Sequence, residues 1–237
     1  MRLAPLFALA TAGCFAAPGP ATAETRTYEL PPFDSVSVSS GLTAIVDVGG
    51  PQSVRAEAPS ESILDQLKVD VRNGRLELGL ETGIVQWLFG PGQQQPFVIH
   101  VSAPEIKAAE ASSGADVEVN GMAGETLSLG ASSGAALAAT GTSGGNVSLD
   151  VSSGADLKVA GKCATLTAGA SSGATLEARD LLCEEVNADL SSGAHAEVHA
   201  QQAIGADASS GAGIVVHGSP ADVEIDTSSG GSVDFAS

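Results

Sequence analysis

Carboxylates that could hold a metal ion stand at one repeated place in this sequence, two residues before a recurring Ser-Ser-Gly tripeptide. They are Glu110, Asp150, Asp189, Asp207 and Asp226. If the tripeptides stack in space, the last three side chains are about 5 Å apart in successive repeats. Ca²⁺ takes about six to eight oxygen ligands, and a flat column offers few of them. We therefore interpret the column as solvated charge and predict no metal site, with Asp189, Asp207 and Asp226 as its weak candidates.

Histidines form the second group with metal-binding chemistry. His199 and His217 occupy the same place in adjacent repeats, and His195 lies four residues before His199. Stacked imidazoles can ligate a transition metal, but no third ligand stands at a fixed spacing, so we interpret the pair as incidental. A polysaccharide lyase needs a base beside its carboxylates, and Lys158 and Arg179 fall in different columns. The abundant serines lack a paired base, and the sequence has no phosphate-loop or zinc motif, so we predict no catalytic residue and no cofactor.

Two cysteines stand at equivalent places in neighbouring repeats. Cys163 and Cys183 are twenty residues apart. Stacking would bring their Cα atoms to about 5 Å, inside the usual disulfide range. Equivalent side chains on parallel strands point the same way, however, which would leave two adjacent thiols. We favour the disulfide, and free thiols stay open as the alternative.

One aromatic segment is the best candidate for ligand binding. Trp87, Leu88 and Phe89 lie in a glycine-flanked stretch, and Trp87 is the single tryptophan of a chain that is 3% aromatic. These side chains either pack over the end of the fold or bind a glycan, a partner chain or a neighbouring subunit. We favour packing and keep the stretch as the binding candidate.

The elements that must position these residues are short repeats. Seven Ser-Ser-Gly tripeptides recur every 18–20 residues, with first serines Ser112, Ser132, Ser152, Ser171, Ser191, Ser209 and Ser228. Apolar residues alternate with polar ones on both sides of each tripeptide, as a half-buried strand requires. The glycines that we expect to turn the chain are Gly114, Gly134, Gly154, Gly173, Gly193, Gly211 and Gly230. A second set marks the opposite turn: Gly121, Gly141, Gly161 and Gly218.

These repeats predict an all-β fold, a right-handed parallel β-helix with two sheets and coils of about 20 residues. We assign residues 104–237 to seven Ser-Ser-Gly coils. The repeat is not evident in residues 24–103, which we predict to be an irregular N-terminal β region that caps the first coil, in one continuous domain with the repeats. Asn73-Gly74 predicts a hairpin in that region. At the other end we expect Phe235, the bulkiest residue of its column, to close the last coil.

The first 23 residues have the pattern of a signal peptide. Arg2 precedes a short apolar run that ends at the small-residue site Ala21-Thr22-Ala23. Cleavage before Cys14, as in a lipoprotein, is the alternative. Both readings predict an exported protein, periplasmic or on the cell surface, and the run is too short to span a membrane. The net charge of −18 opposes binding to nucleic acid.

Three segments before the repeats carry a resemblance to a known family. They are Phe33-Asp34-Ser35-Val36, Leu67-Lys68-Val69 and Asn73-Gly74-Arg75-Leu76. Together with the glycine-serine turns that follow, the chain from Phe33 onward resembles the putative autotransporter adhesin, head GIN domain family. The resemblance implies a right-handed β-helix similar in shape to pectin lyases, without recognised catalytic residues, and a role in cell adhesion.

The sequence thus favours an exported, non-enzymatic binding or adhesion module that recognises a glycan or other surface polymer, or a surface protein. Two alternatives stay open: a carbohydrate-active enzyme of β-helical fold, and a structural protein of the cell envelope. The oligomeric state is not indicated.

Overall fold

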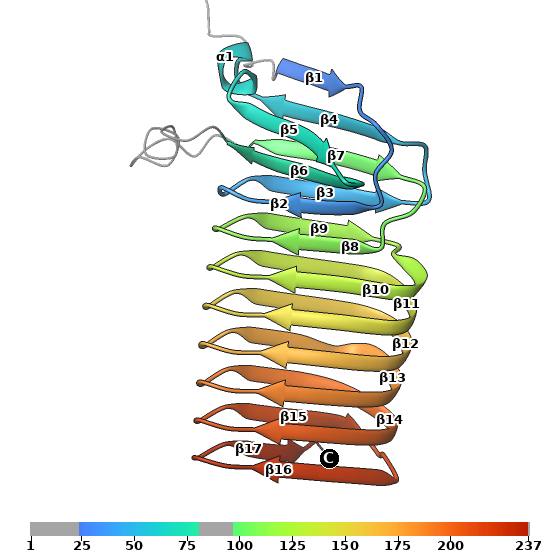
Figure 1. Ribbon diagram of the computed structural model, residues 1–237, viewed down its shortest axis with the longest axis vertical. Helices are drawn as coiled ribbons and strands as arrows, with labels where there is room; N and C mark the ends of the chain where they lie inside the picture. The colour runs from blue at the N-terminus through green and yellow to red at the C-terminus, as the bar shows by residue number, and fades with distance from the viewer. Residues whose placement is uncertain (1–23, 81–96, 237) are drawn as a thin grey trace, which may run out of the picture.

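The computed structural model describes residues 24–80 and 97–236 and shows one long stack of strands (Figure 1). The described residues are 68% strand and 2% helix. Its elements are β1 (Glu24–Tyr28), β2 (Ser35–Val38), β3 (Thr43–Val48), β4 (Ser53–Ala58), α1 (Glu61–Leu64), β5 (Leu67–Arg72), β6 (Arg75–Leu80), β7 (Val98–Ala103), β8 (Ala108–Ala111), β9 (Asp116–Asn120), β10 (Ala123–Ala131), β11 (Ala136–Val151), β12 (Asp156–Ala170), β13 (Thr175–Leu190), β14 (His195–Ala208), β15 (Gly213–Gly218), β16 (Asp222–Thr227) and β17 (Ser232–Phe235). The predicted all-β, parallel β-helical fold is confirmed.

Alternating side chains build the core between the two sheets. In β12, Leu157 and Val159 are buried whereas Asp156 and Lys158 are exposed, which is the period of two that the sequence predicts. The same pattern in the coils before the last one gives one continuous apolar core from Phe33 to Val216. Alanine is frequent in its inward columns, so the sheets lie close together.

Successive coils pair in parallel and in a constant register. Leu127 of β10 aligns with Val147 of β11, which aligns with Leu166 of β12. Each of the long strands β11 to β14 continues around the corner opposite the Ser-Ser-Gly turns. Register shifts occur at that corner, as between Ala139 and Thr142. The corner therefore absorbs the variation in repeat length, and the seven turns from Ser112 to Ser228, which enclose about six turns of the helix, stay aligned.

Each Ser-Ser-Gly turn has two central residues in the left-handed region. In the coil at Ser171, φ is 56° at Ser172 and 69° at Gly173, and the Ala174 N–H donates to the Ser171 carbonyl at 3.3 Å. Positive φ at both central residues defines a type I′ turn, which joins strands with little splay. The Gly173 N–H donates to the carbonyl oxygen of Ser192 in the next coil at 3.1 Å. The turns thus form a hydrogen-bonded column, seen along the left edge of Figure 1.

The parallel stack begins earlier than the sequence analysis placed it. Ser39-Ser40-Gly41 is an eighth turn of the same kind, with φ of 64° at Ser40 and 69° at Gly41. Its flanking strands β2 and β3 pair in parallel with β8 and β9, and the Gly41 N–H donates to the Ser113 carbonyl at 3.0 Å. The statement that residues 24–103 contain no repeat is therefore wrong. The intervening chain leaves the stack and returns, so two consecutive coils are 73 residues apart in sequence.

The rest of the N-terminal region covers the first coil. β6 and β7 stack in parallel on β2 and β3, and β4 and β1 continue that sheet with antiparallel pairs. The predicted hairpin at Asn73-Gly74 joins β5 and β6, with positive φ at both residues. In Figure 1, β1, β4 and α1 lie beyond the parallel coils at the N-terminal end. These elements cover this end of the core.

None of the described residues covers the C-terminal coil in this way. Phe235 is 47% exposed and does not close the coil, because Val223 and Ile225 of the same coil stay 49% and 39% exposed. The expectation that Phe235 shields the last coil is wrong: its side chain shares the open edge of the stack with the residues that it was expected to cover.

Candidate functional site

A shallow groove of about 530 Å³ runs beside the column of Ser-Ser-Gly turns. It crosses successive coils, from Ser37 of β2 to Ser191 after β13. Its lining residues come from equivalent places in each coil: Ser37, Glu110, Ala111, Ser112, Gly130, Ala131, Ser132, Asp150, Val151, Ser152, Gly169, Ala170, Ser171, Asp189 and Ser191. We call this feature the serine groove.

The repeat places three kinds of groups along the serine groove. The first serine of each turn is half-buried and forms one side. Between the two sides lie residues such as Ala131 and Val151, whose side chains point into the core. The residue two before the serine forms the other side, and here carboxylates alternate with Gly130 and Gly169. A Cβ atom added at Gly130 would have no neighbour nearer than 3.7 Å, so this glycine leaves open space between Glu110 and Asp150.

The carboxylates of the serine groove differ in their partners. Arg75 Nη1 lies 2.6 Å from Glu110 Oε2, so this acid is neutralised by a cation of β6. The Ser148 hydroxyl donates to Asp150 Oδ2 at 3.4 Å. Because strands stack about 4.8 Å apart, the alternate carboxylates are spaced about 10 Å apart along the groove. The groove therefore presents a hydroxyl in every coil and a carboxylate in every second coil, of which Glu110 is neutralised by Arg75.

The predicted acidic column is present at the far end of this face. Asp189, Asp207 and Asp226 occupy the same register in β13, β14 and β16 and line a second hollow of about 290 Å³. His199 aligns with His217 in β14 and β15, and His217 Nε2 lies 3.1 Å from Glu197 Oε2. Among the residues that the structure describes, no group of three or more His, Cys, Asp or Glu is arranged to hold a metal ion.

The two cations considered for lyase chemistry are each paired with an acid of the following coil. Lys158 Nζ lies 3.0 Å from Glu177 Oε2, and Arg179 Nη1 lies 3.8 Å from Glu197 Oε2. Neither lines the serine groove. The geometry thus brings neither Lys158 nor Arg179 to the carboxylates of the groove. The hydroxyl and carboxylate groups of the groove can accept and donate hydrogen bonds along an extended ligand.

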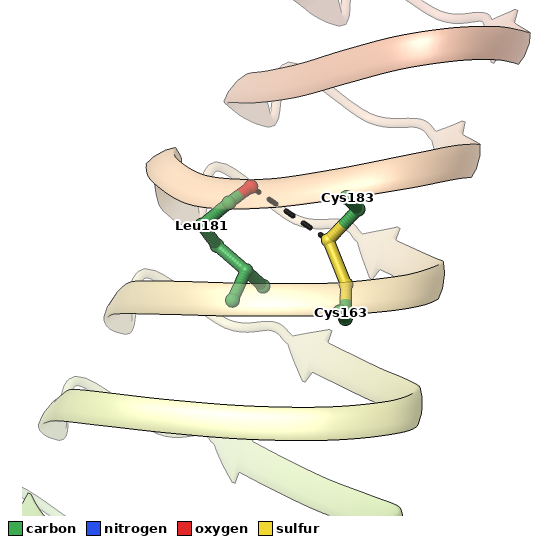
Figure 2. Close-up of a disulfide and its surroundings, with 3 residues drawn as sticks. All are labelled: Cys163, Leu181 and Cys183. Carbon is green, nitrogen blue, oxygen red and sulfur yellow. Dashed lines mark hydrogen bonds between the residues drawn. A yellow bond between two sulfur atoms is a disulfide. The ribbon is translucent and has the colours of Figure 1, made fainter.

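Figure 2 shows Cys163 of β12 and Cys183 of β13 joined by a disulfide. Their Cα atoms are 4.5 Å apart, and the two residues share one register position in adjacent strands. Cys183 Sγ lies 3.7 Å from the Leu181 carbonyl oxygen, a contact without a donated hydrogen because a bonded sulfur has none. Both cysteines are buried, so the bridge links two coils inside the fold and lies away from the serine groove.

The aromatic candidates Trp87, Leu88 and Phe89 lie outside the described residues. The strands on either side of them are described: β6 pairs with β2 and β7 with β3, the two strands that flank Ser39-Ser40-Gly41. Sequence reasoning missed the serine groove itself. Its signal was available, because glycine and carboxylate alternate two residues before the serines from Glu110 to Asp189.

Solved structures share this elongated β-helical fold. A putative adhesin from Bacteroides fragilis superposes with a TM-score of 0.80 at 15% identity, over 91% of this chain and 97% of that one. A putative lipid binding protein from Parabacteroides distasonis (TM-score 0.67, 17% identity) and a putative adhesin from Parabacteroides merdae (0.66, 16%) each match over 92% of this chain and 98% of their own. At these identities the likeness shows the fold alone.

The family follows from the sequence match. The model of the putative auto-transporter adhesin, head GIN domain family matches residues 32–220, and this chain belongs to that family. The resemblance stated from the sequence is thereby confirmed. Among curated proteins none matches the chain significantly. The family and the similar structures bear the names of adhesins or of a lipid binding protein, and no enzyme is among those named here.

Proposed function

We propose that this protein is an exported, non-enzymatic binding module that recognises an extended surface polymer or protein segment along the serine groove. One observation carries the proposal: the groove presents the same hydroxyl group in every coil, from Ser112 to Ser191, beside an open glycine or a carboxylate. A ligand with a regular repeat can make the same contact several times along such a surface.

The charge of the groove and of the chain narrows the class of ligand. Glu110, Asp150 and Asp189 line the groove, and the whole chain has a net charge of −18. Like charges repel, so anionic polymers are disfavoured. Serine hydroxyls both donate and accept hydrogen bonds, which suits the hydroxyl groups of sugars and the peptide groups of an extended chain. The favoured ligand is therefore a neutral or basic linear polymer, with a neutral surface glycan as the first class to test.

Export is part of the proposal and rests on the signal-peptide pattern of residues 1–23 and on the adhesin-like family. In the part of the chain that the structure describes, no helix is both long and apolar enough to cross a bilayer. Periplasm or cell surface is the proposed location, with lipidation at Cys14 as the alternative attachment.

The test is a glycan array with matched groove variants. Gly130→Gln fills the open place in the groove, and the 3.7 Å clearance around an added Cβ lets the fold accept it. Thr126→Gln is the control, because Thr126 is an exposed residue of β10, four positions before Gly130, and does not line the groove. We expect specific binding to neutral glycans by the wild type and Thr126→Gln, and at least about tenfold weaker binding by Gly130→Gln.

Two further arms separate the competing hypotheses. Trp87→Ala tests the aromatic segment: loss of binding there, with Gly130→Gln unchanged, would move the site out of the groove. Incubation of each bound glycan with the protein, followed by product analysis, tests the enzymatic alternative. Release of fragments would replace the binding-module proposal with catalysis.

A further inference from the structure

The C-terminal end of the solenoid exposes residues that belong to core columns. Val223, Ile225 and Phe235 are 49%, 39% and 47% exposed. Their register partners one coil earlier are buried: Ile204, Ala206 and Val216, at 2%, 2% and 0%. The inward columns thus continue into the last coil, where nothing described covers them.

The last coil also has unpaired strand edges. Of the strands that the structure describes, only β14 pairs with β16 and only β15 pairs with β17. Figure 1 places both strands at the end of the stack, opposite the end covered by β1, β4 and α1. A free edge offers a row of N–H and C=O groups that an added strand can pair with.

Charge on this end has a single sign. The outward residues of β16 are Asp222, Glu224 and Asp226, which alternate with Val223 and Ile225. Residues 180–237 contain ten Asp and Glu and no Lys or Arg. A strand added to β16 would therefore place every second side chain against the exposed apolar pair and the others beside carboxylates.

We propose that the free edge of β16 is a docking site for an extended basic segment of another protein, in which Lys or Arg alternates with apolar residues. Pairing of main-chain groups fixes the segment on the edge, its apolar side chains cover Val223 and Ile225, and its cations lie beside the three carboxylates. A second copy of this chain is a poor occupant, because it would bring its own carboxylates against Asp222, Glu224 and Asp226.

Peptide binding is measured by NMR titration of the whole protein, a method that detects weak complexes. The probe is the peptide acetyl-Lys-Val-Lys-Val-Lys-Thr-amide, and the controls are its Glu-for-Lys counterpart and a version with the three Lys residues grouped. We expect the alternating Lys peptide to bind about tenfold or more tightly than either control. The shifted amide signals should lie in β16 and its neighbours.

Two double variants make the test specific. Val223→Asp/Ile225→Asp adds two negative charges at side chains that are already exposed. Nonspecific attraction of the cationic peptide would then rise, whereas docking that depends on the apolar pair is lost. Val215→Asp, an outward position of β15, is the matched control and keeps binding. Glu224→Lys/Asp226→Lys should reverse the preference from the Lys peptide to the Glu peptide.

Several results would overturn the proposal. They are equal binding of the Lys and Glu peptides, binding that survives Val223→Asp/Ile225→Asp, or a preference unchanged by charge reversal. Sedimentation that shows a concentration-dependent dimer, abolished by Val223→Asp/Ile225→Asp, would assign this edge to a second copy instead. Because Gly130 and the serine groove lie outside the last coil, these results are independent of the glycan test.

Discussion

Alanine at Gly161 should destabilise the protein about three times as much as alanine at Gly173. Gly161 lies at the corner opposite the Ser-Ser-Gly turns, with φ of 147°, and a Cβ there would overlap the carbonyl oxygen of Thr142 and lie 2.8 Å from its backbone N and C atoms. Gly173 also has positive φ, 69°, but a Cβ there meets no atom within 4 Å. Gly130 has neither constraint and is the control.

The expected free energies follow from these surroundings. A left-handed backbone costs an alanine about 1–2 kcal/mol, and the stiffer unfolded chain returns about 0.4–1 kcal/mol, so Gly173→Ala should cost about 1 kcal/mol. Gly161→Ala carries the same backbone strain and, in addition, a cost of about 1–3 kcal/mol because the added Cβ forces packed backbone atoms apart. The total loss of stability should be about 3 kcal/mol. Gly130→Ala should change stability by less than about 0.5 kcal/mol.

Thermal unfolding followed by circular dichroism measures the series. In a chain of this size, each kcal/mol of lost stability lowers Tm by about 2–4 °C. Tm should therefore fall by about 3 °C for Gly173→Ala and by about 9 °C for Gly161→Ala. Equal shifts at Gly161 and Gly173 would refute the close approach at the corner. A loss at Gly130 as large as that at Gly173 would refute the role of positive φ in the turn.

Four other substitutions test local features. Thr142→Val should raise stability by about 1–3 kcal/mol in thermal unfolding, because the Thr142 hydroxyl is buried in an apolar column without a hydrogen-bond partner. Ser172→Asn should stabilise by about 0.5 kcal/mol, since asparagine suits the left-handed φ of 56° better than serine does; an unchanged or lower Tm would contradict the type I′ turn. The Cys163→Ala/Cys183→Ala variant should lose about 3 kcal/mol, the loop-closure contribution of a bridge across 20 residues, and reducing agent should lower the Tm of the wild type alone. Burial raises the pKa of Tyr28, the single tyrosine, above its ordinary value of 10.0, so its phenolate absorbance should appear later in an alkaline titration than in the unfolded chain. The contribution of Tyr28 to the free energy of unfolding is then fully present below pH 10 and is lost as the pH rises through the pKa of the folded state. In the Tyr28→Phe variant this alkaline loss of stability should be absent.

The fold could be predicted because the repeat specifies the register. A constant period aligns Leu127, Val147 and Leu166 in one column, and period-two alternation assigns each to the inside. Only one of the two residues with positive φ in each turn was predicted. Glycine was expected to take positive φ, but the second serine, such as Ser172, takes it as well. Serine rarely adopts a positive φ, so the sequence alone gave no reason to expect that conformation at the second serine of each turn.

Two features depend on contacts that no local pattern specifies. Ser39-Ser40-Gly41 stacks on Ser112-Ser113-Gly114 only because the chain between them folds back onto the same end of the stack. The serine groove arises where equivalent residues of six coils line up in space, from Ser37 to Ser191. Sequence reasoning considered the acidic column separately, as a metal candidate, and did not see that Gly130 leaves room beside it. The exposure of Phe235 likewise depends on where the last coil ends in space.

Affinity as a function of ligand length tests the proposed groove most directly. The five serines from Ser112 to Ser191 span four coil spacings, or about 19 Å. For a neutral linear glycan that binds on the array, calorimetry with oligomers of increasing length should show affinity that rises with each added sugar and levels off once the oligomer spans about 19 Å. Gly130→Gln should interrupt that rise, and Thr126→Gln should leave it intact. A single sugar that binds as tightly as the long oligomers, or a rise that Gly130→Gln leaves unchanged, would contradict recognition of an extended polymer along the serine groove.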